Sequence, residues 1–244
     1  RGLGDVYKRQ VLHLVPYRES SVIVRFLTES AGKISGIYRG VRGNKRKSKA
    51  VVQPLYSGVV EYLGKPDLFT ISNFEANRYP ALTGPGLYSG LYVAELLVKV
   101  LGEGQGEEQL LDETVRVIND LETNTGLASK LRRFEFRLME ILGYGVDFTS
   151  EAVVHEAIDP EGTYVYVDQV GFVRERSDAP LQGSEISAIP GSMLQQFACG
   201  DFSDEAGGVI AKRISTIALS SLMGNKTLSS RKIFRSELTR DSKD

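Results

Sequence analysis

The first third of the chain carries the pattern that most restricts its fold: five short strand-like segments with turns between them. The segments are VLHLV (11–15), SVIVRFL (21–27), ISGIYR (34–39), PLYSGVVEYL (54–63) and LFTISNF (68–74). They are rich in β-branched and aromatic residues, and Pro- or Gly-containing turns separate them. Five short strands within about 65 residues suit a small closed barrel better than a sandwich. We therefore predict an OB-type barrel over residues 11–80.

Helical spacing of apolar residues begins after the stretch YPALTGPG (79–86). The first expected helix faces a core through Leu87, Leu91, Ala94, Leu97, Val98 and Leu101. A second is expected from about Glu107 to Leu121, and a third carries Leu131, Phe134, Leu138 and Leu142 on one face. A long helix is expected from about Asp204 to Met223, with Ile210, Ile214, Ile217, Ala218 and Leu222 inward, and a last basic helix begins near Leu228.

A hairpin inserted among these helices is predicted by YVYVDQVGFVRER (164–176). The expected fold class is therefore α+β. It consists of a five-stranded OB-fold barrel over 11–80, followed by a mainly α-helical domain over 81–240 with that small hairpin inside it.

Composition excludes several classes of protein. The chain has 244 residues, of which 25% are charged and 41% hydrophobic, as in ordinary soluble globular proteins. No apolar run approaches the roughly 20 residues of a membrane span. The single cysteine, Cys199, excludes a disulfide framework and suits a reducing, cytosolic compartment. His13 and His155 have no second ligand at short spacing, so we expect no metal site. The opening RGLGDVYKRQ (1–10) lacks an initiator Met, so we treat it as a truncated or non-native start and leave it out of the fold assignment.

Motifs for catalysis are weak. SAGK (30–33) matches the S-x-x-K pattern of acyl enzymes without either companion motif, and a turn between strands explains it equally well. Glu107 and Glu108 are adjacent, so they diverge on a helix and cannot form an acid/base pair. GEGQG (102–106) lacks the context of a phosphate-binding loop. The sequence therefore predicts a protein that is not an enzyme.

Charge is strongly segregated although its net value is only −1. No acid occurs between Glu29 and Glu61, where the bases are Lys33, Arg39, Arg42, Lys45, Arg46, Lys47 and Lys49. These basic residues are explained either as part of a solvated loop or as a nucleic-acid contact between two barrel strands. Aromatic residues that could stack on bases are interleaved with the strands, although most are expected in the core: Tyr17, Phe26, Tyr38, Tyr56 and Tyr62. We favour nucleic-acid binding.

Two further cationic groups are candidates. GNKTLSSRKIFRSELTR (224–240) forms a second basic surface that includes Lys226 and Arg231, although cations near a helix C-terminus also have a purely stabilising role. Arg132 and Arg133 lie next to Phe134. These two arginines either pair with nearby acids or form a cationic rim beside an apolar pocket, which would suit an acidic peptide with a free carboxylate.

Several segments resemble the bacterial RecO recombination mediator family. They are VLHLVPYRESSVIVRFLTESAGKISGIYRGVRGNKRKS (11–48), QPL (53–55), LYSGLYVAELL (87–97), LRRFEFRLMEILGYGVDF (131–148) and LSSRKIFR (228–235). Many members of this family carry two Cys-x-x-Cys pairs, and none occurs here between Gly143 and Ser177. The sequence therefore resembles the zinc-free, gammaproteobacterial-like branch, and the hairpin must be held by its own packing.

The resemblance implies an OB-fold domain, a helical domain and no cofactor. It also implies binding of single- and double-stranded DNA, annealing of complementary strands, and help in loading the recombinase onto DNA covered by single-strand binding protein (SSB). The implied partners are RecR and the SSB C-terminal tail, with Arg132, Arg133 and Phe134 as the candidate tail site, and the implied location is cytoplasmic and nucleoid-associated. Two alternatives stay open: an OB-fold RNA-binding protein, and a non-catalytic interaction scaffold.

Overall fold

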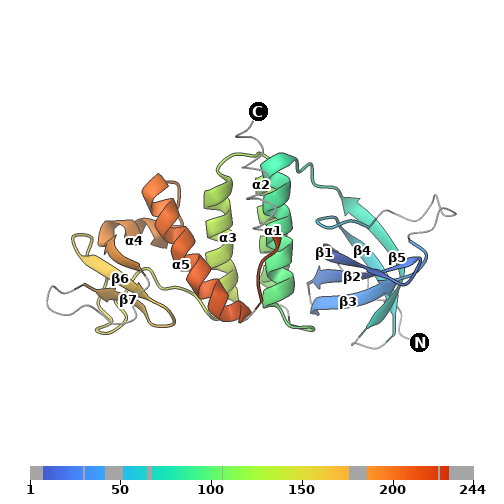
Figure 1. Cartoon of the computed structure of the whole chain (residues 1–244), viewed down its shortest axis with the longest axis horizontal. Coiled ribbons are helices and arrows are strands. Elements are labelled where there is room, and N and C mark those ends of the chain that lie inside the picture. Colours follow the sequence, from blue (N-terminus) through green and yellow to red (C-terminus); the bar gives the residue numbers. More distant parts are fainter. Residues whose placement is uncertain are drawn as a thin grey trace. The chain divides into compact units, whose positions relative to one another are not determined.

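The computed structural model describes residues 8–29, 31–41, 52–64, 68–105, 107–175, 186–224 and 226–230. These residues form eight strands and five helices (Figure 1). The chain divides into two compact units. The first, here called the barrel unit, comprises Arg1–Thr125 and Thr227–Asp244, and the second, here called the hairpin unit, comprises Gly126–Lys226.

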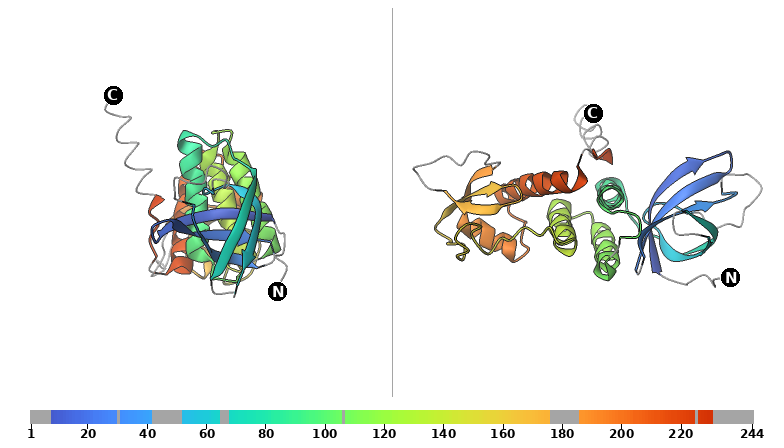
Figure 2. Two further views of the ribbon diagram at one scale, coloured as in Figure 1. Left: turned by 90° about the vertical axis from the view of Figure 1, so that its right-hand side faces the viewer. Right: turned by 90° about the horizontal axis from the view of Figure 1, so that it is seen from below.

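The barrel unit contains a closed five-stranded barrel. Its strands are β1 (Lys8–Tyr17), β2 (Ser21–Thr28), β3 (Gly32–Tyr38), β4 (Ser57–Leu63) and β5 (Phe69–Arg78). Their order around the barrel is β1-β2-β3-β5-β4, and β1 closes the barrel by pairing with β4. The β3–β5 pair is parallel and the others are antiparallel, and the strands cross one another in the side view of Figure 2 (left). The predicted OB-fold barrel is confirmed.

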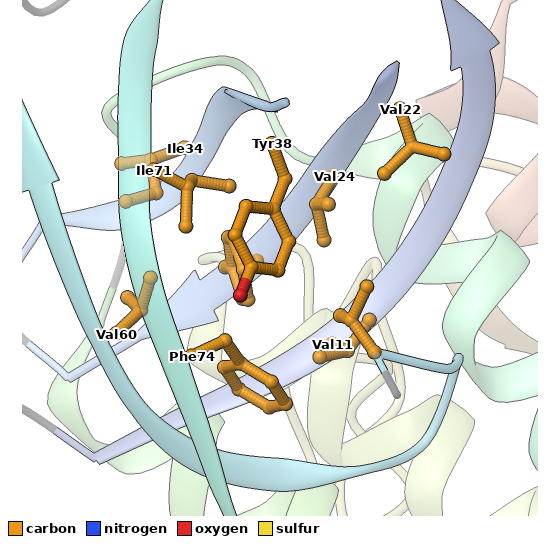
Figure 3. Packing of buried hydrophobic residues seen from close by; sticks show 10 residues of the cluster. Val11, Val22, Val24, Ile34, Tyr38, Val60, Ile71 and Phe74 are labelled. Atoms are coloured by element: carbon orange, nitrogen blue, oxygen red, sulfur yellow. The ribbon is translucent and has the colours of Figure 1, made fainter. Parts of the chain in front are cut away.

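Alternating side chains fill the barrel. In β2, Val22 and Val24 point inward with Tyr38 and Phe74 (Figure 3), and Phe26 belongs to the same buried cluster, with its ring centroid 5.9 Å from that of Phe74. Tyr38 and Phe74 are completely buried, and Phe26 is 1% exposed. Phe26 and Tyr38 were candidates for base stacking. They belong instead to the core, because the interior of a small barrel is filled by bulky side chains.

The barrel begins before Val11. Lys8 and Gln10 pair with Val59 and Ser57 of β4, and the Gln10 side chain accepts a hydrogen bond from the Ser57 hydroxyl at 2.7 Å. The sequence-based assignment began the barrel at Val11 and left residues 1–10 out, whereas the structure starts β1 at Lys8, and Lys8–Gln10 form the part of β1 that pairs with β4.

Two helices complete the barrel unit: α1 (Gly84–Val100) and α2 (Glu108–Leu121). Pro85 lies in the first turn of α1, where a missing backbone N–H costs nothing. Ala94, Leu97 and Leu101 are buried as predicted, but Leu87 is 37% exposed, and Tyr92, Val93 and Leu96, which were not assigned to the inward face, are also buried. Apolar residues occupy more than one side of this helix, so their spacing alone did not fix the buried face.

The hairpin unit combines three helices with a small sheet. In chain order its elements are α3 (Leu127–Ile141), β6 (Thr163–Val167), β7 (Gly171–Arg174), β8 (Ile186–Pro190), α4 (Gly191–Ala198) and α5 (Glu205–Met223). The predicted hairpin is confirmed as β6–β7, while β8 and α4 were not predicted. Helix α5 begins where expected because the Asp204 carboxylate accepts a hydrogen bond from the Gly207 amide at 2.7 Å. Of its predicted inward residues, Ile214 is buried and Ile210 and Ile217 are partly exposed.

A cluster of five phenylalanines holds the hairpin to the helices. Phe148 is at its centre, with ring centroids 5.0–6.5 Å from those of Phe136, Phe172, Phe197 and Phe202. These rings come from α3, β7, α4 and the segment after α4, so the cluster links elements far apart in sequence. No group of three or more His, Cys, Asp or Glu within the described ranges is placed to hold a metal ion. Nor is any helix of the described residues long and apolar enough to cross a membrane.

Candidate nucleic-acid interface

The outer face of β1–β2–β3 presents two cross-strand rows of side chains. Val15, Ile23 and Ile37 form one row, and His13, Arg25 and Ser35 form the next. His13 is exposed and the other five residues are half-buried. On β2, the residues that alternate with them along the strand point inward and are buried. The pleat therefore gives this part of the barrel an outer face that is apolar in one row and polar in the other.

Two arginines, Arg18 and Arg39, lie at the end of this face where β1 turns into β2 and β3 ends, and a third, Arg25, lies near the middle of β2 opposite His13 and Ser35. Arg39 is exposed in the turn after β3, and Arg25 is half-buried on β2. Arg18 is exposed in the β1–β2 turn, and its guanidinium carbon lies 5.2 Å from the centroid of the Tyr17 ring. Tyr17 is one of the five aromatic residues that were candidates for base stacking. It lies two residues after Val15 on β1 and therefore points to the same outer side of the strand.

Arg18 and Arg25 were missed in the sequence. The signal for Arg25 was present, because strict alternation in SVIVRFL points Ile23 and Arg25 away from the core that holds Val22 and Val24. Arg18 stands in a turn with a positive φ of 52°, which no spacing rule indicates.

Histidine adds no charge to this face at neutral pH. Although its side chain is exposed, His13 is partly desolvated by the protein around it, and this desolvation lowers its pKa; the neighbouring Arg25 guanidinium lowers it further, against an opposing effect of Glu95. The imidazole is therefore neutral at pH 7, and the positive charge of this face comes from its arginines.

Lys33, predicted to bind DNA, has a different position. It is 7% exposed, and its Nζ donates to the carbonyl oxygens of Val98 at 3.1 Å and Leu101 at 2.5 Å, at the end of α1. Glu103 Oε1 lies 3.6 Å from the same nitrogen. Cations favour the negative end of a helix dipole, so Lys33 stabilises the junction of β3 with α1.

The other predicted DNA-binding residues are placed as follows. Arg42, Lys45, Arg46, Lys47, Lys49 and Arg231 lie outside the described residues. The described chain ends at Val41, directly after the Arg39–Gly40 turn, and resumes at the buried Val52. Lys226 is exposed but belongs to the hairpin unit, whereas Arg39 belongs to the barrel unit.

The predicted peptide site on α3 is divided between the surface and the interior. Arg132 is 6% exposed, and its guanidinium donates to Glu135 at 2.5 Å and to the Ser215 hydroxyl at 3.1 Å. Phe134 is 3% exposed. Arg133 alone among the three is exposed, and it donates to the Gly200 carbonyl at 3.1 Å. Arg132 and Phe134 therefore hold the hairpin unit together, and Arg133 is the member that faces solvent.

Comparison with known proteins agrees with this fold. The model of the family "Recombination protein O N terminal" matches residues 8–79, and that of "Recombination protein O C terminal" matches residues 83–218. The chain belongs to the RecO family. It is 36% identical to DNA repair protein RecO of Haemophilus influenzae (strain PittGG) over 235 residues, covering 95% of this chain and 96% of the relative. The same protein of Pseudoalteromonas translucida is 35% identical over 232 residues, which cover 95% of this chain and 97% of that protein.

Family membership gives this chain a role in DNA repair. It is a recombination mediator and not a catalytic enzyme, as the sequence predicted. The family match also begins at residue 8, in agreement with the start of β1.

Proposed function

We propose that this RecO protein binds single- and double-stranded DNA through the outer face of β1–β2–β3. The observation that carries the proposal is the position of three arginines on this part of the barrel: Arg18 and Arg39 at the end where β1 turns into β2, and Arg25 on the outer face near the middle of β2. Cations that neutralise phosphates release condensed counterions, and this release drives binding without reading the sequence. The neighbouring row of Val15, Ile23 and Ile37 offers an apolar surface for bases.

The same chemistry supports annealing of complementary strands. Two strands repel each other through their phosphates, so a surface that neutralises phosphates on both lowers the cost of bringing them together. We further propose that the protein acts with RecR to load the recombinase onto SSB-coated DNA. Support for this step comes from membership of a family whose members are recombination mediators.

Salt-dependent binding tests the DNA face. The variant Arg25→Ser/Arg39→Ser removes two cations from the face, and each phosphate contact contributes about 0.7 to the slope of log K against log salt for single strands. We expect the slope to become shallower by about 1.4 in this variant. Arg116→Ser is the control, because Arg116 is exposed on α2 of the same unit and pairs with Glu113. If the double variant and wild type show the same slope of log K against log salt, the outer face of β1–β2–β3 is not the DNA-binding site.

Reversal of Lys45, Arg46 and Lys47 to Glu tests the basic segment of residues 39–49 in the same titration. If this segment contacts DNA, most of the salt dependence is lost in this variant. Retention of the wild-type slope would assign binding to other cations.

The SSB-tail site is also a proposal, and it now rests on Arg133. A fluorescent peptide with the acidic SSB tail sequence should bind Arg133→Ala more weakly than wild type, because a cation that pairs with a carboxylate is lost. Arg137→Ala is the matched control, since Arg137 lies one turn along α3 and pairs with Glu140. Equal affinities of Arg133→Ala and wild type would place the site elsewhere.

RNA binding is the competing function, because an OB barrel with a basic loop serves either nucleic acid. DNA and RNA oligomers of one sequence, titrated side by side, separate the two, since RNA-specific binding uses 2′-OH contacts. The scaffold alternative predicts no nucleic-acid binding at moderate salt.

A further inference from the structure

The hairpin unit carries exposed valines at one end of its small sheet. Val153 and Val154, in the segment between α3 and β6, are 64% and 52% exposed, and Val170, in the turn between β6 and β7, is 56% exposed. Single apolar side chains are common on protein surfaces, whereas apolar side chains gathered in one place mark interaction sites. We call these three residues the valine tip.

Two separate segments meet to form the valine tip. The Ala152 amide donates to the Phe172 carbonyl oxygen at 2.8 Å. Gly171 approaches so closely that a Cβ placed on it would lie 3.3 Å from the Ala152 methyl group. Because consecutive Cα atoms are about 3.8 Å apart, the Cα atoms of Val153 and Val170 are separated by at most about 14 Å. A partner segment of four or five extended residues, roughly 14–17 Å long, therefore reaches all three valines.

A buried carboxylate holds the first of these segments in place. Glu151 is 6% exposed, and its Oε2 accepts hydrogen bonds from the amides of Val153 at 3.0 Å and Val154 at 2.6 Å. Its Oε1 accepts from the Arg174 amide of β7 at 3.4 Å, and its own amide donates to the Glu156 carbonyl oxygen at 2.8 Å. Because the amides of Val153 and Val154 are bonded within the unit, these valines offer a partner their side chains.

Strained turns flank the valine tip. His155 follows Val154, Gln169 precedes Val170, and both have a positive φ, 58° and 60°. This backbone conformation is costly for a residue with a Cβ, and it persists only where the surrounding structure fixes it. The exposure of the valines is therefore a fixed feature of the fold.

The surroundings of the valine tip are acidic. Glu156, two residues after Val154, is exposed, and Arg174 pairs with Asp159 at 2.8 Å. A negative surface repels the phosphates of DNA and of anionic lipids, and it would also repel the same face of a second copy of the chain. A protein with a basic contact surface fits best. Residues 147–175 contain one arginine, Arg174, and no lysine, against seven acids: Asp147, Glu151, Glu156, Asp159, Glu161, Asp168 and Glu175.

We propose that the valine tip is a docking site for a protein partner whose contacting segment places apolar side chains between lysines or arginines. Apolar contact supplies affinity, and the surrounding carboxylates select a basic partner over an acidic one. The valine tip belongs to the hairpin unit, whereas the proposed DNA face belongs to the barrel unit. The inference therefore goes beyond the proposed function and does not depend on it.

Peptide titration of the full-length chain tests the docking site. The probe is a fluorescein-labelled peptide in which valine alternates with lysine, and its matched peptide has glutamate in place of lysine. We expect wild type to bind the lysine peptide and not the glutamate peptide. The variant Val153→Thr/Val154→Thr/Val170→Thr keeps the branched side-chain shape and should raise the Kd of the lysine peptide about 10-fold. Val209→Thr is the matched control and should bind like wild type, because Val209 is 58% exposed on α5 of the same unit.

A second pair of variants tests the charge. Glu156→Gln should raise the Kd of the lysine peptide about 2–5-fold and make binding less sensitive to salt. Asp112→Asn removes the same charge from an exposed position on α2 of the barrel unit and should have no effect. The proposal is wrong if wild type does not bind the lysine peptide, if it binds both peptides equally, or if the triple threonine variant binds like wild type.

Other occupants give different results with the same triple variant. Loss of self-association in analytical ultracentrifugation would assign the valine tip to a second copy, and loss of binding to phosphatidylglycerol vesicles would assign it to a membrane. Either result would overturn the proposal. The salt dependence of single-stranded DNA binding should be that of wild type, so a failure of the proposed DNA-binding function is seen separately from a failure of the docking site.

Discussion

Replacing Lys33 with Met separates a structural role from a DNA contact. The Met side chain keeps the length of the Lys33 stem but removes its ammonium, which donates to the Val98 and Leu101 carbonyl oxygens. The Gly102 amide donates to the Gln105 side chain, so it does not supply the usual helical partner of Val98. A hydrogen bond to a charged group contributes about 1.5–3 kcal/mol. Burial of the Met side chain offsets part of the loss, and we expect Lys33→Met to destabilise the barrel unit by about 2–4 kcal/mol.

The assay is urea and thermal unfolding followed by far-UV circular dichroism, with DNA titration of the same samples. At about 2–4 °C per kcal/mol, the midpoint should fall by about 5–15 °C, while the salt slope of DNA binding stays that of wild type. Glu103→Gln is the control, because Glu103 is 51% exposed, lies 3.6 Å from Lys33 Nζ, and should cost less than about 1 kcal/mol when neutralised. A Lys33→Met variant as stable as wild type but with a slope shallower by about 0.7 would refute the structural role. That result would restore Lys33 as the DNA contact expected from the sequence.

Three further outcomes follow from the hydrogen bonds and packing. Arg132→Met leaves the buried Glu135 carboxylate without its cation and should destabilise the hairpin unit by about 3–5 kcal/mol in thermal unfolding, whereas Arg133→Met should cost less than about 1 kcal/mol. Phe148→Ala removes the central ring of the aromatic cluster and should cost about 3–5 kcal/mol, visible as loss of the near-UV aromatic signal at a lower urea concentration. Burial raises the pKa of Glu95, but hydrogen bonds from Lys99, Ser230 and the Ser229 amide outweigh it and lower the pKa from 4.5 to about 2, so the contribution of this carboxylate to stability is present above pH 4.5 and is lost as pH falls toward 2. Glu95→Gln should lack this acid-dependent loss, and an unchanged pH profile of unfolding would contradict the assignment.

Local patterns in the sequence were sufficient to predict the barrel, because β-branched segments and turns fix strands over short distances. The same holds for α5, where Asp204 begins the helix, and for the β6–β7 hairpin. The spacing of apolar residues along a helix could not show how the helix is rotated about its own axis, and therefore which of its faces is buried. On α1 the residues Val93 and Leu96 are aliphatic like Leu87, and only tertiary packing decides which of them is buried. Strand β8 was missed for a related reason, since its pairing with β6 is a long-range contact.

The candidate site shows why counting cations in a sequence overestimates a binding surface. Lys33 and Arg132 carry the same charge as Arg39 and Arg133, but the first two are buried and bonded to carbonyl or carboxylate groups of their own unit. A cation whose donors are satisfied internally cannot neutralise a phosphate without breaking those bonds, so its charge is lost to the surface. Strand parity corrects part of this error, because it assigns Arg25 to the outer face from sequence alone. The rest of the error cannot be corrected from the sequence, because it depends on which helix end or carboxylate folds against each lysine or arginine. That information lies in contacts between residues far apart along the chain, such as Lys33 with Leu101.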